Sequence, residues 1–414
     1  MSFEKLFLVT LTIFIVLSLN CDSDSSKKES VEDRAAIIHD KVLTVDTHVD
    51  TPMRLVRSDF DPGERHDPRK RGGKVDFPRM KEGGLDAIFF AVFIGQGERT
   101  PEGNEKAKEK ALKIFDAIHA TLEKNSDQAE LAVTPEDAYR IEKTGKRAIY
   151  IGIENGYPVG NDLSMIENYY NLGARYITLC HTRNNDICDS STDSTEHHGL
   201  SPFGEKVVAE MNRVGMMIDV SHISDESFYD VLALSKAPII ASHSCARTIC
   251  DNPRNLNDDM LKKLAENNGV IQMCVLSSYV KKPEPNPERE AAFKELREKY
   301  RNYNDLSEDE QKAARAEWYA LGEKYPQKLA NVSDVVDHID HIVKVAGIDH
   351  VGIGTDFDGG GGVDGCYDVS EMGNITIELV KRGYTEKQIR KIWGGNVMRV
   401  FRDVEKMARK LQKS

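Results

Sequence analysis

The sequence lacks several features that are typical of other classes of protein. It has no basic stripe: Asp and Glu number 68 against 56 Lys and Arg, and the formal net charge is -12. This charge argues against nucleic acid as a partner. There are only seven cysteines and no C-x-x-C pair, which excludes a zinc ribbon. A dense disulfide framework is excluded as well, so at most one or two incidental bridges are expected.

Long apolar runs are also scarce, and the one at the N-terminus is too short to span a bilayer. Residues 6–19 are apolar and follow Lys5, which predicts a signal peptide over residues 1–20. The next residues, Leu17-Ser-Leu-Asn-Cys21, resemble the lipobox of bacterial lipoproteins. We therefore expect lipidation of Cys21, a polar tether over residues 21–32 and a barrel domain over residues 33–414. The alternative is an ordinary signal peptide that is cut nearby.

Either signal predicts a location in the cell envelope, outside the cytoplasm. With Cys21 lipidated, the protein would be anchored in a membrane and face the periplasm or the cell surface. The C-terminal residues 406–414 are charged, so no removable hydrophobic anchor tail is expected there.

Eight short apolar segments alternate with helical patterns along the 414 residues. This alternation predicts a (β/α)8 TIM-type barrel, because an open doubly wound sheet more often stops at five or six strands. A charged segment over residues 279–327 predicts a helical insertion between strands 7 and 8, interpreted as a solvated face rather than a lid. Residues 103–132 are expected to be helical. The expected strands are residues 42–45, 85–94, 146–154, 174–181, 215–222, 237–243, 269–276 and 350–356.

Residues 215–244 predict a βαβ unit that brings two histidines together. His222 ends one apolar strand, and His243 ends the next strand after a short helix. The two strands must be parallel, so both imidazoles emerge at the same edge of the sheet. One such histidine would most often be a hydrogen-bonded core residue, whereas two at matched positions favour a divalent ion.

Polar residues also follow the first, third, fourth and eighth expected strands, at the edge where barrel enzymes carry their chemistry. His48 and Asp50 share one face of an extended chain, which suits one metal ion. The candidate ligands are more numerous than one metal ion with an open coordination position needs. Two ions are therefore expected, with Glu154 as a bridging carboxylate. Imidazoles mixed with carboxylates favour zinc, with manganese, cobalt or iron as alternatives. The set is His48, Asp50, Glu154, His181, His222, His243 and Asp356.

The chain resembles the membrane (renal) dipeptidase family, whose bacterial members are zinc dipeptidases. The resemblance runs from Asp46-Thr-His-Val-Asp50 to Gly395-Asn-Val-Met-Arg-Val400. The densest matches are Gly199-Leu-Ser-Pro-Phe-Gly204, Ile218-Asp-Val-Ser-His-Ile-Ser224, Ser242-His-Ser244, Pro253-Arg-Asn255 and Gly354-Thr-Asp-Phe-Asp-Gly359.

The resemblance implies hydrolysis of dipeptides by a metal-bridged hydroxide at two zinc ions per chain. It assigns His48 and Asp50 to one ion and His222 and His243 to the other, with Glu154 between them. It also implies that His181 binds the scissile carbonyl and that Arg254 pairs with the terminal carboxylate of the substrate. Asp356 would handle the proton. Family members are commonly homodimers, so a homodimer is a further expectation.

Two other functions stay open at this point. One is a metal-dependent, amidohydrolase-like enzyme that acts on another amide or a lactone. The other is a non-catalytic lipoprotein that binds peptides. Sequence alternation does not separate Asp356 from Asp358, since only the resemblance selects Asp356. Without the resemblance, Arg254 would be interpreted as a solvated loop residue.

Two further patterns are given structural interpretations. Gly359-Gly-Gly-Gly362 is expected to be a flexible loop rather than a phosphate cradle, because the adjacent aspartates would repel an anion. His338 and His341 share a face of the helix expected over residues 333–346, and packing at the surface is favoured over an exposed metal site.

Overall fold

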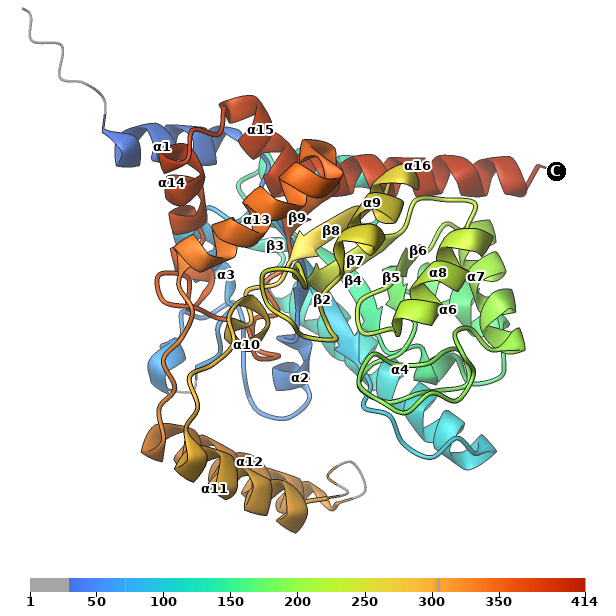
Figure 1. Cartoon of the computed structure of the whole chain (residues 1–414). Coiled ribbons are helices and arrows are strands. Elements are labelled where there is room, and N and C mark those ends of the chain that lie inside the picture. The colour runs from blue at the N-terminus through green and yellow to red at the C-terminus, as the bar shows by residue number, and fades with distance from the viewer. Residues whose placement is uncertain (1–29, 71, 302, 304–305, 414) are drawn as a thin grey trace, which may run out of the picture.

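A computed structural model describes residues 30–70, 72–301, 303 and 306–413 of the chain. Within these residues the strands are all parallel and run in the order β1-β2-β4-β5-β6-β7-β8-β9, with β3 beside β4 (Figure 1). The strand bounds are β1 Val45–Val49, β2 Ala87–Phe93, β3 Ala129–Leu131, β4 Arg147–Glu154, β5 Ala174–Thr178, β6 Met217–Asp219, β7 Ile240–Ser244, β8 Val270–Met273 and β9 Val351–Ile353.

The sheet closes on itself between its first and last strands. Val49 and Phe357 form a parallel bridge just beyond β9. The amide of Asp356 donates to the carbonyl of His48 at 2.9 Å, and the amide of Asp50 donates to Phe357 at 2.9 Å. A nearly closed eight-strand barrel results, which confirms the predicted TIM-type fold.

The ninth strand, β3, was not predicted, because its residues continue a helical pattern. The helix α4 ends at Lys124, and residues 129–131 pair instead with residues 147–149 of β4. β5 pairs with β4 only from Ile151 onward, so β3 fills the edge of β4 that β5 leaves open. The expected helix over residues 103–132 is therefore wrong from residue 125 onward.

Most helices begin at capping side chains that the sequence supplies. Thr100, Ser201, Ser224 and Asn257 each accept a hydrogen bond from an amide in the first turn of α4, α7, α8 and α9. The helix bounds are α1 Val31–Lys41, α2 Pro52–Leu55, α3 Phe77–Glu82, α4 Pro101–Lys124, α5 Pro135–Glu142, α6 Ser164–Asn171, α7 Pro202–Val214, α8 Asp225–Leu234, α9 Asp258–Glu266, α10 Ser277–Val280, α11 Pro287–Lys299, α12 Glu308–Lys324, α13 Val332–Ala346, α14 Gly373–Lys381, α15 Glu386–Arg390 and α16 Asn396–Leu411, with a π-helical turn η6 Lys391–Gly395.

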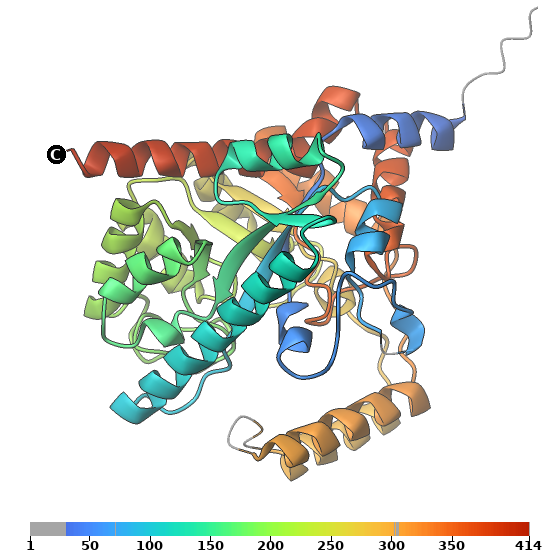
Figure 2. The same cartoon turned by 180° about the vertical axis from the view of Figure 1, so that it is seen from behind.

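Alternation along the strands separates an inner core from an outer core. Phe89 of β2 stacks on Tyr150 of β4, and both pack with Tyr176 of β5. Phe401 of α16 contacts Tyr150 and closes the end of the barrel where the strands begin. Figures 1 and 2 show α16 lying across that end. The opposite end, where the strands finish, is left for polar side chains.

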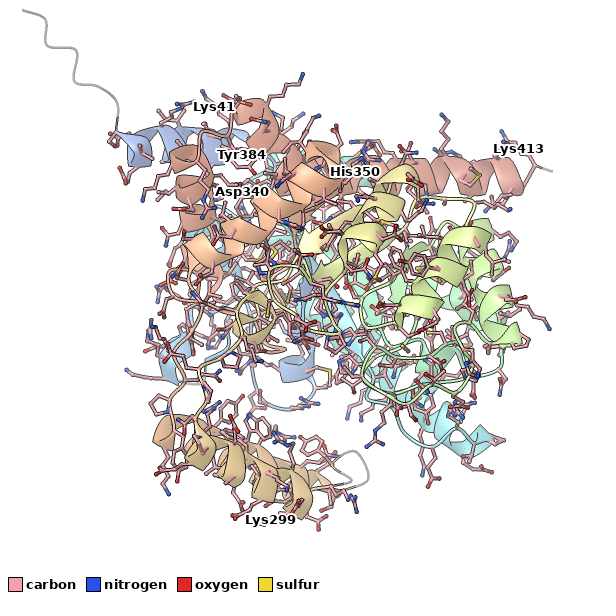
Figure 3. All side chains as sticks on the ribbon, in the orientation of Figure 1. Lys41, Lys299, Asp340, His350, Tyr384 and Lys413 are labelled. Atoms are coloured by element: carbon pink, nitrogen blue, oxygen red, sulfur yellow. The ribbon has the colours of Figure 1, made fainter. Side chains whose placement is uncertain are left out.

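The insertion between β8 and β9 is a hairpin of α11 and α12 that stands over the end where the strands finish (Figures 1 and 2). Figure 3 labels Lys299 of α11 on the far side of the molecule from His350, which precedes β9. Arg289 and Arg315 of the hairpin line one cavity together with Asp358 and Gly359 of the barrel. The helical insertion is confirmed; most of its side chains are exposed or partly exposed to solvent, and one side of it lines this cavity.

Candidate metal centre

Seven polar side chains meet at the end of the barrel where the strands finish. His48 and His243 lie within β1 and β7, and Glu154 is the last residue of β4. The other four lie on the loops that follow β1, β5, β6 and β9. All but His48 line one pocket of about 320 Å³, and His48 is fully buried beside them. The seven are His48, Asp50, Glu154, His181, His222, His243 and Asp356.

Glu154 lies at the centre of this group and presents its two oxygens to different partners. Oε2 lies 3.5 Å from Nε2 of His48. Oε1 faces three imidazoles, with Nε2 of His222 at 3.1 Å and Nε2 of His181 and His243 each at 3.5 Å. The carboxylate therefore lies between His48 of β1 and the pair formed by His222, which follows β6, and His243 of β7.

The geometry of these side chains fits metal ions. Ligand atoms lie within 4.8 Å of one another in three groups. Several buried atoms aimed into the site have no hydrogen-bond partner, including Nε2 of His48 and Oδ1 of Asp50. Buried polar atoms are rarely left unpaired, so a cation explains them best. The groups are His48, Glu154 and His243; Glu154, His181 and His222; and His48, Asp50 and Asp356.

Burial and mutual charge shift the pKa values of three of these side chains, Glu154, His222 and His243, in the directions that metal binding requires. Burial opposes ionisation of Glu154, but the facing imidazoles of His48 and His181 outweigh it and hold the pKa of Glu154 well below its usual range. Burial lowers the pKa of His222 and His243 well below that of a free imidazole. Neutral imidazole and ionised carboxylate are the forms that bind metal.

Asp356 differs from Glu154 in its ionisation. Burial, followed by the neighbouring Cys274 and Asp50, raises the pKa of Asp356 well above its usual value. A carboxyl group in this state keeps its proton to a higher pH than a free aspartate does.

Two hydrogen-bonded side chains behind the ligands orient them, and the sequence analysis missed both. Nδ1 of His48 lies 2.8 Å from the hydroxyl of Tyr176, which leaves Nε2 facing the site. Nδ1 of His243 lies 2.8 Å from Ser242 Oγ, whose hydroxyl donates to Asp219 at 2.6 Å. Such partners fix the tautomer and the ring orientation of a metal-binding histidine. Their only sequence signal is alternation within the strands.

Glycines make room for this arrangement at two points. A Cβ on Gly152 of β4 would lie 2.0 Å from the ring of Tyr176, and one on Gly359 would lie 2.1 Å from Oδ2 of Asp50. The amides of Gly359, Gly360 and Gly361 donate to the carbonyl of Asp356 at 3.2, 3.1 and 2.7 Å. The glycine run is therefore a hydrogen-bonded turn that lets the carboxylates approach one another.

Two residues of the site have left-handed backbone conformations. His222 has φ 73° and Asp356 has φ 61°. Side chains other than glycine rarely adopt this conformation, and where they do the surrounding structure holds them there. Each residue lies three positions after the end of its strand, β6 or β9, so the backbone turns sharply at the point where it presents the side chain.

The structure distinguishes the two aspartates that follow β9. Asp358 accepts hydrogen bonds from the hydroxyl of Thr51 at 2.8 Å and from Nε of Arg54 at 3.1 Å. The amide of Lys74 donates to it at 2.9 Å. Asp358 thus holds neighbouring loops together, whereas Asp356 faces Asp50 and His48.

Arg254 is buried beside the site rather than solvated. Its Nη2 donates to the carbonyl of His243 at 3.1 Å, and its guanidinium lies 5.3 Å from the centre of the Tyr279 ring. Nε is buried without a partner. Tyr279 and His243 both line the pocket, so Arg254 lies beside the pocket wall.

The expected surface position of His338 is wrong. His338 is fully buried: its Nδ1 accepts from the amide of Ala246 at 3.0 Å, and its Nε2 donates to Val280 at 2.8 Å. Both ring nitrogens are used, so no metal is needed. His341 contacts Asp258 at 2.7 Å.

Two predictions concern the cysteines. The six cysteines from Cys180 to Cys366 are all free and buried, so the described part of the chain has no disulfide. Cys21, the predicted signal peptide and most of the tether lie outside the described residues.

Among the residues that the structure covers, none of the helices combines the length and apolarity of a membrane span.

Comparison with known proteins gives a consistent result. The family model for membrane dipeptidase, peptidase family M19, matches residues 32–414. The dipeptidase tcpJ of Claviceps purpurea is 33% identical over 365 residues, which cover 86% of this chain and 76% of that protein. The crystal structure of the probable dipeptidase PvdM from Pseudomonas aeruginosa is 30% identical, with a TM-score of 0.78, and covers 91% of this chain and 99% of its own.

A more distant likeness supports the fold alone. A metallopeptidase from Rhodobacter sphaeroides, solved with a phosphinate mimic of the dipeptide L-Ala-D-Ala, is 22% identical with a TM-score of 0.69. The likeness covers 88% of this chain and 99% of that one. Because the family model matches nearly the whole described chain and the metal-binding clusters lie where a barrel enzyme carries its site, the chain belongs to the membrane dipeptidase family, peptidase family M19, and is a metallo-dipeptidase.

Proposed function

We propose that this protein hydrolyses dipeptides with two zinc ions, which share Glu154 as a bridging ligand. His48 and Asp50 would hold one ion, and His222 and His243 the other. The observation that carries the proposal is the position of Glu154: one carboxylate oxygen faces His48 and the other faces His222 and His243. A carboxylate placed in this way suits two cations a few ångström apart.

The donor set is the basis for choosing zinc. It combines imidazoles and carboxylates without any thiolate, a mixture that zinc accepts readily. When bound, two such ions would supply a nucleophile from water at neutral pH and a Lewis acid for the carbonyl oxygen. The remaining steps fall to the side chains of the protein.

We assign the proton transfer to Asp356. Its pKa is raised by burial and by Cys274 and Asp50, so the carboxyl group is suited to taking up a proton and delivering it to the departing amine. His181 is about one-fifth exposed and lines the pocket. We assign it to binding of the scissile carbonyl, where an imidazole N–H would stabilise the developing negative charge.

We assign Arg254 to the terminal carboxylate of the substrate. A guanidinium forms paired hydrogen bonds with a carboxylate, and Nε of Arg254 is buried without a partner. A fixed distance between this contact and the metal ions would restrict cleavage to the bond one residue from the C-terminus.

We also propose that Cys21 carries a lipid and anchors the enzyme in the cell envelope, where it would hydrolyse dipeptides outside the cytoplasm. The support is the lipobox-like Leu17-Ser-Leu-Asn-Cys21 and the polar residues that follow it. Mass spectrometry of the membrane fraction tests this, with Cys21→Ser as the variant that would release the protein. The homodimer stays a prediction that light scattering can test.

The central experiment pairs metal analysis of the purified protein with a dipeptide panel before and after chelation. We expect two zinc equivalents per chain, metal-dependent cleavage of dipeptides and recovery when zinc is restored. Arg254→Ala should keep its zinc and lose dipeptide hydrolysis. Full hydrolysis by that variant would favour another amide or a lactone as the substrate, and a metal-loaded wild type without any turnover would contradict the proposal.

A further inference from the structure

The hairpin of α11 and α12 and the loops of the barrel enclose a second cavity of about 570 Å³. Its walls come from both sides: Arg289, Phe293, Arg315 and Trp318 from the hairpin, and Arg54, Lys74 and Tyr367 from the barrel. Asp358 and Gly359 line both this cavity and the metal pocket. The metal pocket and this second space, which we call the cationic chamber, are therefore adjacent and share a wall at Asp358 and Gly359.

The charge of the chamber opposes that of the protein as a whole. Its lining contains five cationic residues against only two acidic ones, Asp358 and Glu323, whereas the whole chain has a net charge of -12. Asp358 is already engaged by Arg54 at 3.1 Å. The cationic residues are Arg54, Arg69, Lys74, Arg289 and Arg315.

Among the residues that the structure describes, the two hairpin arginines are bound by neutral groups rather than by carboxylates. Arg289 donates to the carbonyl of Tyr325 and lies 4.4 Å from the centre of the Phe293 ring. Arg315 donates to the hydroxyl of Tyr303. Elsewhere in the described residues, Arg213 and Arg382 each contact two or three carboxylates. The positive charge of the hairpin arginines is therefore available to an anionic ligand.

Arg57 continues this positive surface into the metal pocket. It lines that pocket, and Arg315 is among the charges that act on it. An anion placed between the pocket and the chamber would therefore meet guanidiniums from both the barrel and the hairpin.

The position of the chamber indicates which part of a dipeptide it would receive. Arg254 follows β7, whereas the chamber adjoins the loops that follow β9 and β1. If the terminal carboxylate lies at Arg254, the amino-terminal residue extends toward Asp356 and Gly359. Its side chain then has the chamber beside it. Aromatic rings of the hairpin, including Trp318 at 46% exposure, would cover the methylene groups of a long side chain.

We propose that the cationic chamber is a specificity site for dipeptides whose amino-terminal residue carries a carboxylate side chain. Arg289 and Arg315 are the residues that recognise it. This inference rests on the proposed dipeptidase function, because it takes the orientation of the substrate from Arg254. It adds a substrate class to that function.

The test compares substrates that differ by one charge, using the zinc-loaded full-length enzyme. We expect kcat/KM for Glu-Ala to exceed that for Gln-Ala by about tenfold or more, as a hydrogen bond between charged groups provides. Ala-Glu and Ala-Gln, which move the same change to the other residue, should differ much less. Equal kcat/KM values for Glu-Ala and Gln-Ala would overturn the inference. So would a preference for Ala-Glu over Ala-Gln as large as that for Glu-Ala over Gln-Ala.

Variants identify the residues. The double variant Arg289→Gln and Arg315→Gln should bring the ratio of kcat/KM for Glu-Ala to that for Gln-Ala close to one, because it lacks the two guanidinium groups. The ratio is measured within one enzyme preparation, so it does not depend on the yield of folded protein. Arg409→Gln on α16, where Arg409 pairs with Glu405, is the matched control and should keep the wild-type ratio. A double variant that keeps the wild-type ratio would overturn the assignment.

The outcomes also separate this inference from the function beneath it. Metal-dependent cleavage of Ala-Ala with no preference for Glu-Ala rejects the chamber alone. No cleavage of any dipeptide by the zinc-loaded enzyme rejects the proposed function and the chamber with it. A third outcome is that high salt abolishes both the preference for Glu-Ala over Gln-Ala and a similar preference for Ala-Glu over Ala-Gln. This result would indicate long-range electrostatic steering and would also reject the chamber.

Discussion

Nδ1 of His48 lies 2.8 Å from the hydroxyl of Tyr176, and this contact determines which imidazole nitrogen faces the metal centre. Tyr176 is fully buried, and its ring occupies space that only a glycine at position 152 leaves open. The metal site thus depends on residues of three strands, β1, β4 and β5, before any ion binds.

Replacing Tyr176 with phenylalanine should weaken metal binding about 10- to 100-fold, because His48 loses the partner that orients it. Competition with a chelator of known affinity measures the change. Tyr150→Phe is the matched control, since the hydroxyl of Tyr150 donates to Thr134 at 2.7 Å, away from the site. Equal metal affinities for the two variants would refute the role of Tyr176.

Asp356→Asn should retain its metal and lower kcat by about 10²- to 10⁴-fold, the usual contribution of a positioned acid or base. Metal content and kcat are measured on the same preparation. Asp358→Asn serves for comparison and should affect turnover less, because Asp358 binds Thr51 and Arg54 rather than facing the metal ligands. An Asp356→Asn enzyme of normal activity would end the assignment of the proton transfer.

Gly359→Ala should damage both stability and turnover. The added Cβ would lie 2.1 Å from Oδ2 of Asp50 and 2.2 Å from Oδ1 of Asp356. Overpacking of this kind costs about 1–3 kcal/mol, and a shift of about 1 Å in a catalytic group can lower the rate about 100-fold. Urea unfolding and kcat/KM record the two effects. Gly373→Ala, whose added Cβ would meet nothing closer than 4.0 Å, should behave like the wild type.

The stability of the protein should fall in mild acid, partly through His39. Its Nε2 donates to Gly83 at 2.9 Å, and its Nδ1 accepts from Thr376 at 2.7 Å, so the folded protein holds the neutral ring. Burial lowers the pKa of His39 below its ordinary value of 6.5. Below pH 6.5 the unfolded chain therefore binds a proton that the folded protein does not, and stability declines as pH falls toward the folded pKa.

His39→Gln removes this proton uptake. The variant should be less stable at pH 7.5 by about 1–3 kcal/mol, the cost of disturbing buried hydrogen bonds. The gap to the wild type should narrow as pH falls from 7 to 5, because only the wild type loses the contribution of His39. Chemical unfolding at several pH values gives both curves, and parallel curves would show that His39 does not titrate in this range.

Removing the metal with a chelator should abolish turnover and lower the melting temperature, because ions that bind only the folded state stabilise it by mass action. Zinc addition should restore both. A melting temperature that does not respond to the chelator would mean that His48, Glu154 and His243 hold no ion in the purified protein.

The sequence predicted the barrel and the meeting of the ligands because strand ends and parallel connections constrain both strongly. His222 and His243 follow from alternation and from the right-handed crossover, and their Nε2 atoms lie 2.9 Å apart. The short strand β3 was missed because residues 129–131 carry a helical pattern and acquire their strand form only by pairing with β4. His338 was misplaced because its partners, Ala246 and Val280, are far away in the sequence.

Other features depend on tertiary contacts that no local pattern encodes. Arg254 resembles a solvated loop arginine in the sequence, and only the fold buries it beside Tyr279 and His243. The left-handed conformations of His222 and Asp356 are imposed by the surrounding loops. Tyr176 reads as one more apolar strand residue, and only the closed barrel brings it beside His48.

The α11–α12 hairpin enters the chain between β8 and β9, whereas each proposed metal ligand belongs to β1, β4, β6 or β7 or to the loops after them. The hairpin side of the cationic chamber, which carries Arg289 and Arg315, is thus one continuous stretch, separate from the segments that bind the ions. A hairpin transplanted from a relative could therefore change which dipeptides are selected while the hydrolytic centre is inherited intact. Selection and chemistry could diverge independently within this one barrel.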